Sequence, residues 1–193
     1  MKVGKTFYAP NRAAWRAWLA KHHRTAPEIF LIYYKKHTGK PRIPYNHAVE
    51  EALCYGWIDS ILKTVDSDRY AQRFTPRKPK SPWSPMNKER GRRLIRAGRM
   101  TASGLERVPA DLQSVERSRP GSRGPRLVLA PDIRDALRAN PATWANFRRF
   151  PASYKRIRIG WIEGARKRPE AFRQRLGYFL KMTAKNKRFG MVQ

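Results

Sequence analysis

The pattern of apolar residues changes along the chain, and this change most constrains the fold. Residues 1–80 combine helical spacing with short runs of β-branched and aromatic side chains. Residues 131–193 show helical spacing alone, which predicts a helical hairpin or small bundle. Residues 114–126 hold almost no apolar side chains and cannot bury a core. The sequence therefore predicts an α+β fold. It has an α+β domain with trailing helices at residues 1–113, a flexible linker at residues 114–130 and a helical domain at residues 131–193.

The first part is predicted to be a small α+β domain in the order helix, strand, helix, strand, strand. Trp15, Trp18 and Leu19 recur at helical spacing behind Asn11, which is a good N-cap residue. The strand candidates are short, β-branched and aromatic, as buried strands are. The expected helices cover residues 12–24 and the stretch between the N-cap Asn46 and Gly56, and the expected strands cover residues 28–35, 57–65 and 69–75.

The last two strands form a predicted hairpin that carries the first candidate site. A turn at residues 66–68 would place Asp59 opposite about residue 75, within diagonal reach of Arg73 or Arg77. One interpretation is a structural Asp–Arg bond that fixes the sheet. The other is a pocket for a small anion, because guanidinium groups bind carboxylates and phosphates, with Asp59 as its evident acid or base. The expected pocket residues are Tyr55, Trp57, Asp59, Arg73, Arg77 and Trp83.

Aromatic side chains around this hairpin have two possible uses. Trp57, Phe74 and Trp83 could offer stacking surfaces to bases, or they could pack in the core. Trp83 lies in a segment with four prolines between residues 76 and 85, which indicates an extended linker or lid. We therefore expect Trp83 to be the most exposed of the three.

The chain is strongly basic, with a formal net charge of +29. Residues 134–189 alone carry sixteen Lys or Arg and three acidic residues. Such a field attracts nucleic acid or another polyanion. Arg outnumbers Lys by 28 to 15, so a compositional bias toward Arg is an alternative explanation. The expected polyanion-binding residues are Arg148, Arg149, Lys155, Arg156, Arg158, Arg166, Lys167 and Arg168.

Acidic residues and cysteine give little sign of catalytic or metal chemistry. Glu50 and Glu51 are adjacent on a predicted helix and point about 100° apart, so we expect a solvated face rather than a catalytic carboxylate pair. Cys54 is the only cysteine, and its helical setting predicts a buried structural thiol. The four histidines have no metal-ligand spacing among them. No catalytic residue and no metal site are predicted.

Several signals of cofactor binding and of membrane targeting are missing from the sequence. It contains neither a phosphate-binding loop nor a dinucleotide-binding glycine motif, so no cofactor is predicted. No apolar run reaches 18 residues, and the N-terminus leads into no signal-peptide core. We expect a cytoplasmic protein that is not an enzyme.

Ordered motifs along both halves resemble those of the YdeI/OmpD-associated family, whose members are often named bacteriocin-protection proteins. The N-terminal resemblance runs from Trp18 to Leu105, and the C-terminal resemblance covers residues 131–180. The motifs in the first half are Tyr34-Lys35-Lys36, Tyr45, the run from Ala48 to Asp59, Arg73-Phe74-Thr75-Pro76-Arg77, Ser81 to Ser84, Asn87 and Gly98-Arg99-Met100-Thr101. Those in the second half are Asp132, Ala136-Leu137, Phe147, Ser153-Tyr154, Trp161-Ile162, Ala165 and Arg175.

The resemblance implies a role in stress or antimicrobial-peptide tolerance, and it transfers no catalytic residues. Residues 108–126 depart from the family pattern, because they are rich in Arg, Ser, Pro and Gly. The leading hypothesis is a basic protein that binds an acidic partner, such as nucleic acid or another polyanion. The alternative is a protein or enzyme that holds a small anion in the pocket around Asp59.

Overall fold

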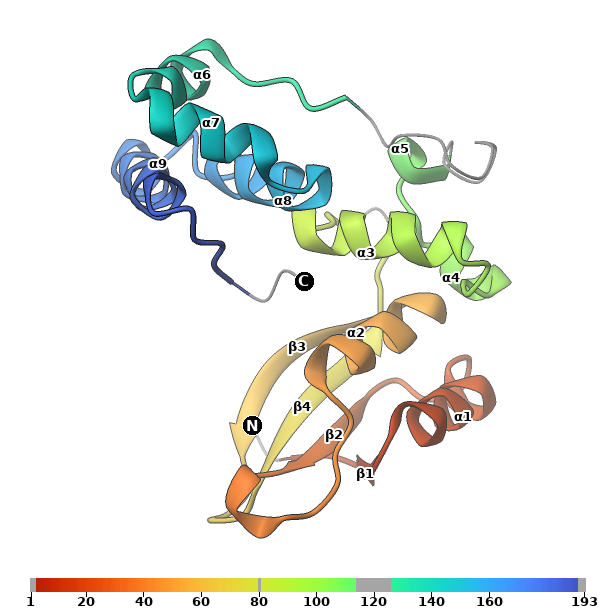
Figure 1. Cartoon of the computed structure of the whole chain (residues 1–193). Helices are drawn as coiled ribbons and strands as arrows, with labels where there is room; N and C mark the ends of the chain where they lie inside the picture. The colour runs from red at the N-terminus through yellow and green to blue at the C-terminus, as the bar shows by residue number, and fades with distance from the viewer. Residues whose placement is uncertain (1–2, 80, 114–125, 191–193) are drawn as a thin grey trace. The chain divides into compact units, whose positions relative to one another are not determined.

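The chain folds into two compact units. The computed structural model describes residues 3–79, 81–113 and 126–190 (Figure 1). The first unit comprises residues 1–82 and 90–120, and the second comprises residues 83–89 and 121–193. Residues 114–125 of the predicted linker lie outside the described residues.

The first unit contains one four-stranded sheet in the order β1-β2-β4-β3, in which only β1 and β2 pair in parallel. The predicted order helix, strand, helix, strand, strand is confirmed. The elements are β1 (Thr6–Tyr8), α1 (Arg12–His22), β2 (Ile29–Tyr34), the 3₁₀ turn η1 (Lys36–Thr38), α2 (Tyr45–Cys54), β3 (Trp57–Thr64), β4 (Arg69–Pro76), α3 (Pro85–Arg96), α4 (Ala102–Leu105) and α5 (Ala110–Gln113). In α3, the residues from Arg90 onward belong to this unit.

Strand β1 is absent from the sequence prediction. It spans three residues and pairs with β2 through the register Thr6↔Phe30. Three residues are too few to show alternation, so the strand exists only through its hydrogen bonds to β2.

Helices α1 and α2 pack together over one face of the sheet. The indole of Trp15 contacts the ring of Phe74 in β4, and its Nε1 donates to the carbonyl of Ala48 in α2 at 3.0 Å. The opposite face carries a smaller apolar cluster around Phe30 and Ile32. Successive residues of β2 are buried on alternate faces, which explains why this strand is a continuous apolar run.

A bulge in β3 changes the register of the hairpin. Near the turn, Thr64 pairs with Tyr70, as the predicted turn requires. Between Asp59 and Leu62 the register shifts by one residue, so that Asp59 pairs with Phe74. Such a slip moves every following side chain to the other face of the strand relative to its partner.

The described part of the second unit is helical, as predicted (Figure 1). Its helices are α6 (Pro131–Arg138), α7 (Pro141–Arg149), α8 (Ala152–Glu163) and α9 (Pro169–Ala184). Three of the four begin at proline, which suits the first helical position because its missing N–H has no partner there anyway. Their buried core consists of Ile133, Leu137, Phe147, Phe150, Tyr154, Ile159, Ile162 and Phe179.

Among the helices of the described ranges, none combines the length and the apolar character that a membrane span requires.

Candidate functional site

The structure does not bring Asp59 and Arg73 together. Asp59 pairs with Phe74, so Arg73 projects from the other face of the sheet. There its Nε donates to Glu28 at 2.7 Å. The predicted contact between Asp59 and Arg73 is wrong because the bulge in β3 shifts the register by one residue. The charge of Asp59 does act on Arg77, the other expected partner.

Asp59 is instead part of a half-buried polar cluster near the start of α2. Its carboxylate accepts a hydrogen bond from the hydroxyl of Tyr45 at 2.7 Å. Burial and this bond raise the pKa of Tyr45 to about 12. Burial lowers the pKa of Arg77 and of Arg90, although the negative charge of Asp59 acts in the opposite direction on both. Arg90 also donates to Asn46 at 2.6 Å.

The aromatic candidates are core residues. Trp57 and Phe74 are buried, and Trp57 Nε1 donates to the carbonyl of His23 at 3.0 Å. Trp83 is only 7% exposed, so the expectation of an exposed tryptophan is wrong. Arg77 is buried, and its guanidinium donates hydrogen bonds to the carbonyls of Ser81 and Pro82. These bonds hold the proline-rich segment to the end of β4.

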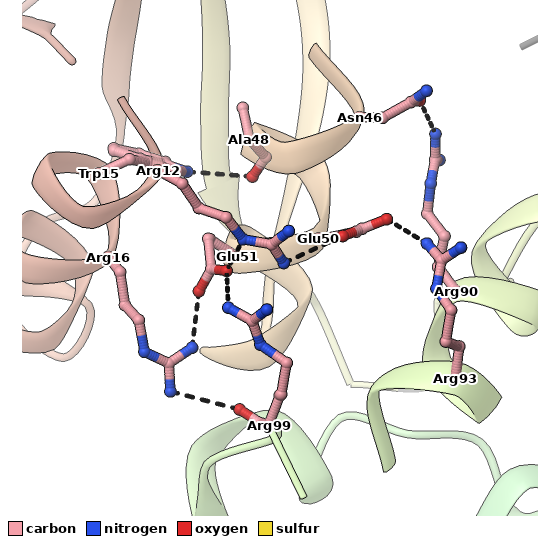
Figure 2. A network of polar contacts seen from close by, with 10 residues as sticks. All are labelled: Arg12, Trp15, Arg16, Asn46, Ala48, Glu50, Glu51, Arg90, Arg93 and Arg99. Atoms are coloured by element: carbon pink, nitrogen blue, oxygen red, sulfur yellow. Dashed lines mark hydrogen bonds and ion pairs between the residues drawn. The ribbon is translucent and has the colours of Figure 1, made fainter. Parts of the chain in front are cut away.

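Glu50 and Glu51 are both buried, which corrects the expected solvated face. The reason is that every residue of α2 from Ala48 to Cys54 is buried, so two adjacent side chains can point apart and still face protein. Figure 2 shows the two carboxylates among the arginine side chains that bind them. Glu51 accepts from Arg12, from Arg16 at 2.6 Å and from Arg99 at 2.6 Å.

Four guanidinium groups surround these two carboxylates, because Arg93 binds Glu50 and Arg12 reaches both acids. Burial raises the pKa of Glu51, but hydrogen bonds from Arg12 and Arg16 outweigh it and hold the pKa below its usual value. The network joins α1, α2, α3 and the segment after α3, and it keeps Glu51 ionised.

A pocket of about 500 Å³ lies beside this network in the first unit. It includes Tyr55 and Trp57 of the predicted site, but its other walls come from residues that the sequence did not indicate. The lining residues are His23, Arg24, Tyr55, Gly56, Trp57, Pro76, Ser103, Glu106 and Arg107.

One polar contact in this pocket joins His23 Nε2 and Ser103 Oγ at 3.0 Å. The two residues are 80 positions apart in the chain, so no local sequence motif predicts the pair. The nearest motif of the family resemblance, Gly98-Arg99-Met100-Thr101, ends two residues before Ser103.

In the second unit, three of the predicted polyanion-binding residues are used internally. Arg156 binds Glu89 through two hydrogen bonds of 2.6 and 2.8 Å. Arg158 is buried, with its guanidinium 4.4 Å from the ring centroid of Phe189. Arg166 binds both Asp132 and Glu163.

The other five predicted residues fall into two groups. Lys167 and Arg168 are exposed in the loop between α8 and α9. Arg148 and Arg149 are exposed at the end of α7, and Lys155 Nζ donates to the carbonyl of Arg148 at 3.1 Å.

Three contacts bring the ends of α7 and α9 together with the start of α8. Asn146 donates to the carbonyls of Thr183 and Ala184 at 3.0 and 3.3 Å, and the amide of Phe189 donates to the hydroxyl of Tyr154 at 3.3 Å. The exposed residues 185–188 therefore join those at the end of α7. We call this group the basic end, and it consists of Arg148, Arg149, Lys155, Lys185, Lys187 and Arg188.

Among the described residues, no three His, Cys, Asp or Glu side chains are grouped so as to hold a metal ion.

Fold and site define a basic α+β protein with a helical C-terminal unit. Residues 7–107, more than half of the chain, match a family model described as a domain of unknown function (DUF8412), and residues 126–186 match the model described as bacteriocin-protection, YdeI or OmpD-associated. The chain therefore belongs to the first family, and its C-terminal part carries the domain of the second. The resemblance to the YdeI/OmpD-associated family is confirmed for that part. No curated protein and no solved structure matches the chain.

Proposed function

We propose that the C-terminal helical unit binds nucleic acid through the basic end. The observation that carries the proposal is that Asp132, Glu163 and Glu170 lie away from the basic end. Asp132 and Glu163 share Arg166 near the end of α8, and Glu170 lies in the first turn of α9. These acids lie at the opposite end from Arg148 and residues 185–188, since α8 and α9 each run from one end to the other.

The other two acids among the described residues of this unit are each bound by an arginine. Glu89 pairs with Arg156, and Asp135 pairs with Arg134. These acids therefore do not neutralise the cations of the basic end, which can bind an external anion. Burial and the nearby charge of Arg148 lower the pKa of Lys155, and a bound phosphate would relieve this repulsion.

Cations near the ends of α7 and α9 have a structural role as well. They offset the partial negative charge of the helix C-termini, an effect of about 0.3–1 kcal/mol each that salt screens. That role needs one cation per helix end, whereas Arg148, Arg149 and residues 185–188 together supply five cations.

The test is a salt titration of binding to a fluorescent DNA duplex, measured by anisotropy. Six phosphate contacts predict a slope of log K against log salt of about −5. Replacing Arg148 and Arg149 by glutamine should make the slope less negative by about two. The matched control replaces Lys167 and Arg168, which are equally exposed in the loop between α8 and α9.

Two results would contradict this function. One is an equal effect of the two double variants, which would make binding a property of net charge. The other is equal affinity for DNA, RNA, heparin and anionic vesicles at physiological salt, which would remove the preference for nucleic acid. The name of the matching family supports a role in protection against bacteriocins, which we propose as the context of this binding.

A further inference from the structure

The pocket of the first unit contains a serine and a histidine in the arrangement that activates a hydroxyl group. His23 Nδ1 lies 2.9 Å from the carbonyl oxygen of Leu19, and Nε2 lies 3.0 Å from Ser103 Oγ. A carbonyl can only accept a hydrogen bond, so Nδ1 carries a proton. In the neutral imidazole Nε2 is then the acceptor, and the hydroxyl of Ser103 donates to it.

Several contacts fix the imidazole of His23. Its backbone N–H also donates to Leu19, and its carbonyl accepts from Trp57 Nε1 at 3.0 Å. Its ring centroid is 5.1 Å from that of Tyr55. The base is thus oriented by a backbone carbonyl, the part that a third side chain plays in a catalytic triad.

The close approach of α4 to the end of α2 fixes the position of Ser103. Thr101 Oγ1 donates to the carbonyl of Cys54 at 2.7 Å and accepts from the amide of Gly104. A Cβ atom at Gly104 would lie 2.1 Å from the same carbonyl, so only glycine allows this contact. Gly56, which has a φ of 75°, leaves room for the backbone of Ser103.

The other polar walls indicate the class of compound that the pocket would take. Arg24, Arg107 and Glu106 line it together with His23 and Ser103. Two guanidinium groups against one carboxylate give the pocket a net positive charge. Guanidinium groups bind carboxylate and phosphate groups, and they also stabilise an oxyanion.

We propose that Ser103 is a nucleophile for small esters that carry a negative charge, with His23 as its general base. Ser103 Oγ forms a bond to the ester carbonyl carbon while its proton moves to His23 Nε2. The bond to the alkoxy oxygen then breaks, and the alcohol leaves with that proton. Water attacks the acyl-serine with His23 again as base, so that the carboxylate and free Ser103 are regenerated.

A fluorophosphonate probe on the full-length protein tests the nucleophile directly, because its phosphorus bonds to an activated serine as fluoride leaves. We expect one label per chain, located on Ser103 by peptide mass spectrometry. Ser103→Ala should abolish the label, and His23→Gln should slow labelling by about 10²-fold or more. Ser67→Ala and His37→Ala are matched controls, because both residues lie exposed around the hairpin turn and should leave labelling unchanged.

Hydrolysis of nitrophenyl esters tests the substrate class. The monosuccinate ester should give a higher kcat/KM than the neutral acetate, and Arg24→Gln should remove the difference. The competing explanation is that the Ser103–His23 bond only ties α4 to α1. In that case the wild-type protein takes no label at Ser103. Ser103→Ala and His23→Gln then lower Tm without a change in ester hydrolysis, and this result would overturn the proposal.

Discussion

Arg16 in α1 binds the fully buried carboxylate of Glu51 in α2, with Nη1 and Oε2 2.6 Å apart. Arg12 and Arg99 bind the same carboxylate, so three guanidinium groups depend on one acid. An isolated buried charge is costly, and the network is stable only while its partners are present.

Loss of the Glu51 charge should therefore destabilise the first unit strongly. We expect Glu51→Gln to lower the free energy of unfolding by about 3–5 kcal/mol, because it leaves three arginines partly uncompensated. Glu28→Gln is the control, since Glu28 and Arg73 form a half-exposed pair that should contribute less than about 1 kcal/mol. Urea unfolding followed by circular dichroism measures both. Equal losses for the two variants would mean that the buried network stabilises the fold no more than the half-exposed pair does.

The same carboxylate predicts how stability depends on acid. The pKa of Glu51 is lower in the folded protein than in the unfolded chain. Its contribution is therefore complete above the unfolded value, about 4.3, and is lost as the pH falls through the folded pKa. Glu51→Gln should flatten the acid side of a stability profile measured between pH 6 and pH 3. Asp132→Asn should not, because Asp132 lies on the surface, where water screens its pairing with Arg166.

Gly104 should tolerate no larger residue. A methyl group there would meet the carbonyl of Cys54 at 2.1 Å, and backbone cannot move aside easily. We expect Gly104→Ala to destabilise the protein by about 1–3 kcal/mol. Gly177→Ala is the matched control in α9, where nothing lies within 4 Å of the added carbon. That change should stabilise the helix by about 0.5–1 kcal/mol, and a loss of stability there would contradict the packing described for α9.

Cys54 should be almost inert in the folded protein. Its thiol is fully buried, and burial raises its pKa to about 11. At pH 8 we expect its reaction with a disulfide reagent to be at least about 100-fold slower than in urea, because the thiolate is the reactive form. The absorbance of the released thiol measures both rates. Rapid reaction of the native protein would show that α2 opens readily.

Five elements of the first unit, α1, β2, α2, β3 and β4, could be predicted because their signals are local. Asn11 caps α1 by accepting from Ala14, and Asp66 closes the hairpin turn by accepting from Arg69, both as their sequence positions indicate. The register between the strands could not be predicted, since the bulge near Asp59 leaves no mark in the composition of β3.

The candidate site was predictable only in part. Tyr55 and Trp57 do line the pocket, yet His23 and Ser103 reach it from distant segments. Burial of Glu51 was also beyond the sequence, because an acid in a helix normally faces water and only the surrounding arginines make its burial tolerable.

The sequence by itself determined the α+β class, the helical C-terminal part and the positive charge, because periodicity, caps and composition are properties of neighbouring residues. Only the tertiary structure decided that Arg73 binds Glu28, that four arginines enclose Glu50 and Glu51, and that Ser103 meets His23. These contacts join residues far apart in the chain, and packing, through one bulge and two close-packed glycines, selects which of the possible partners meet.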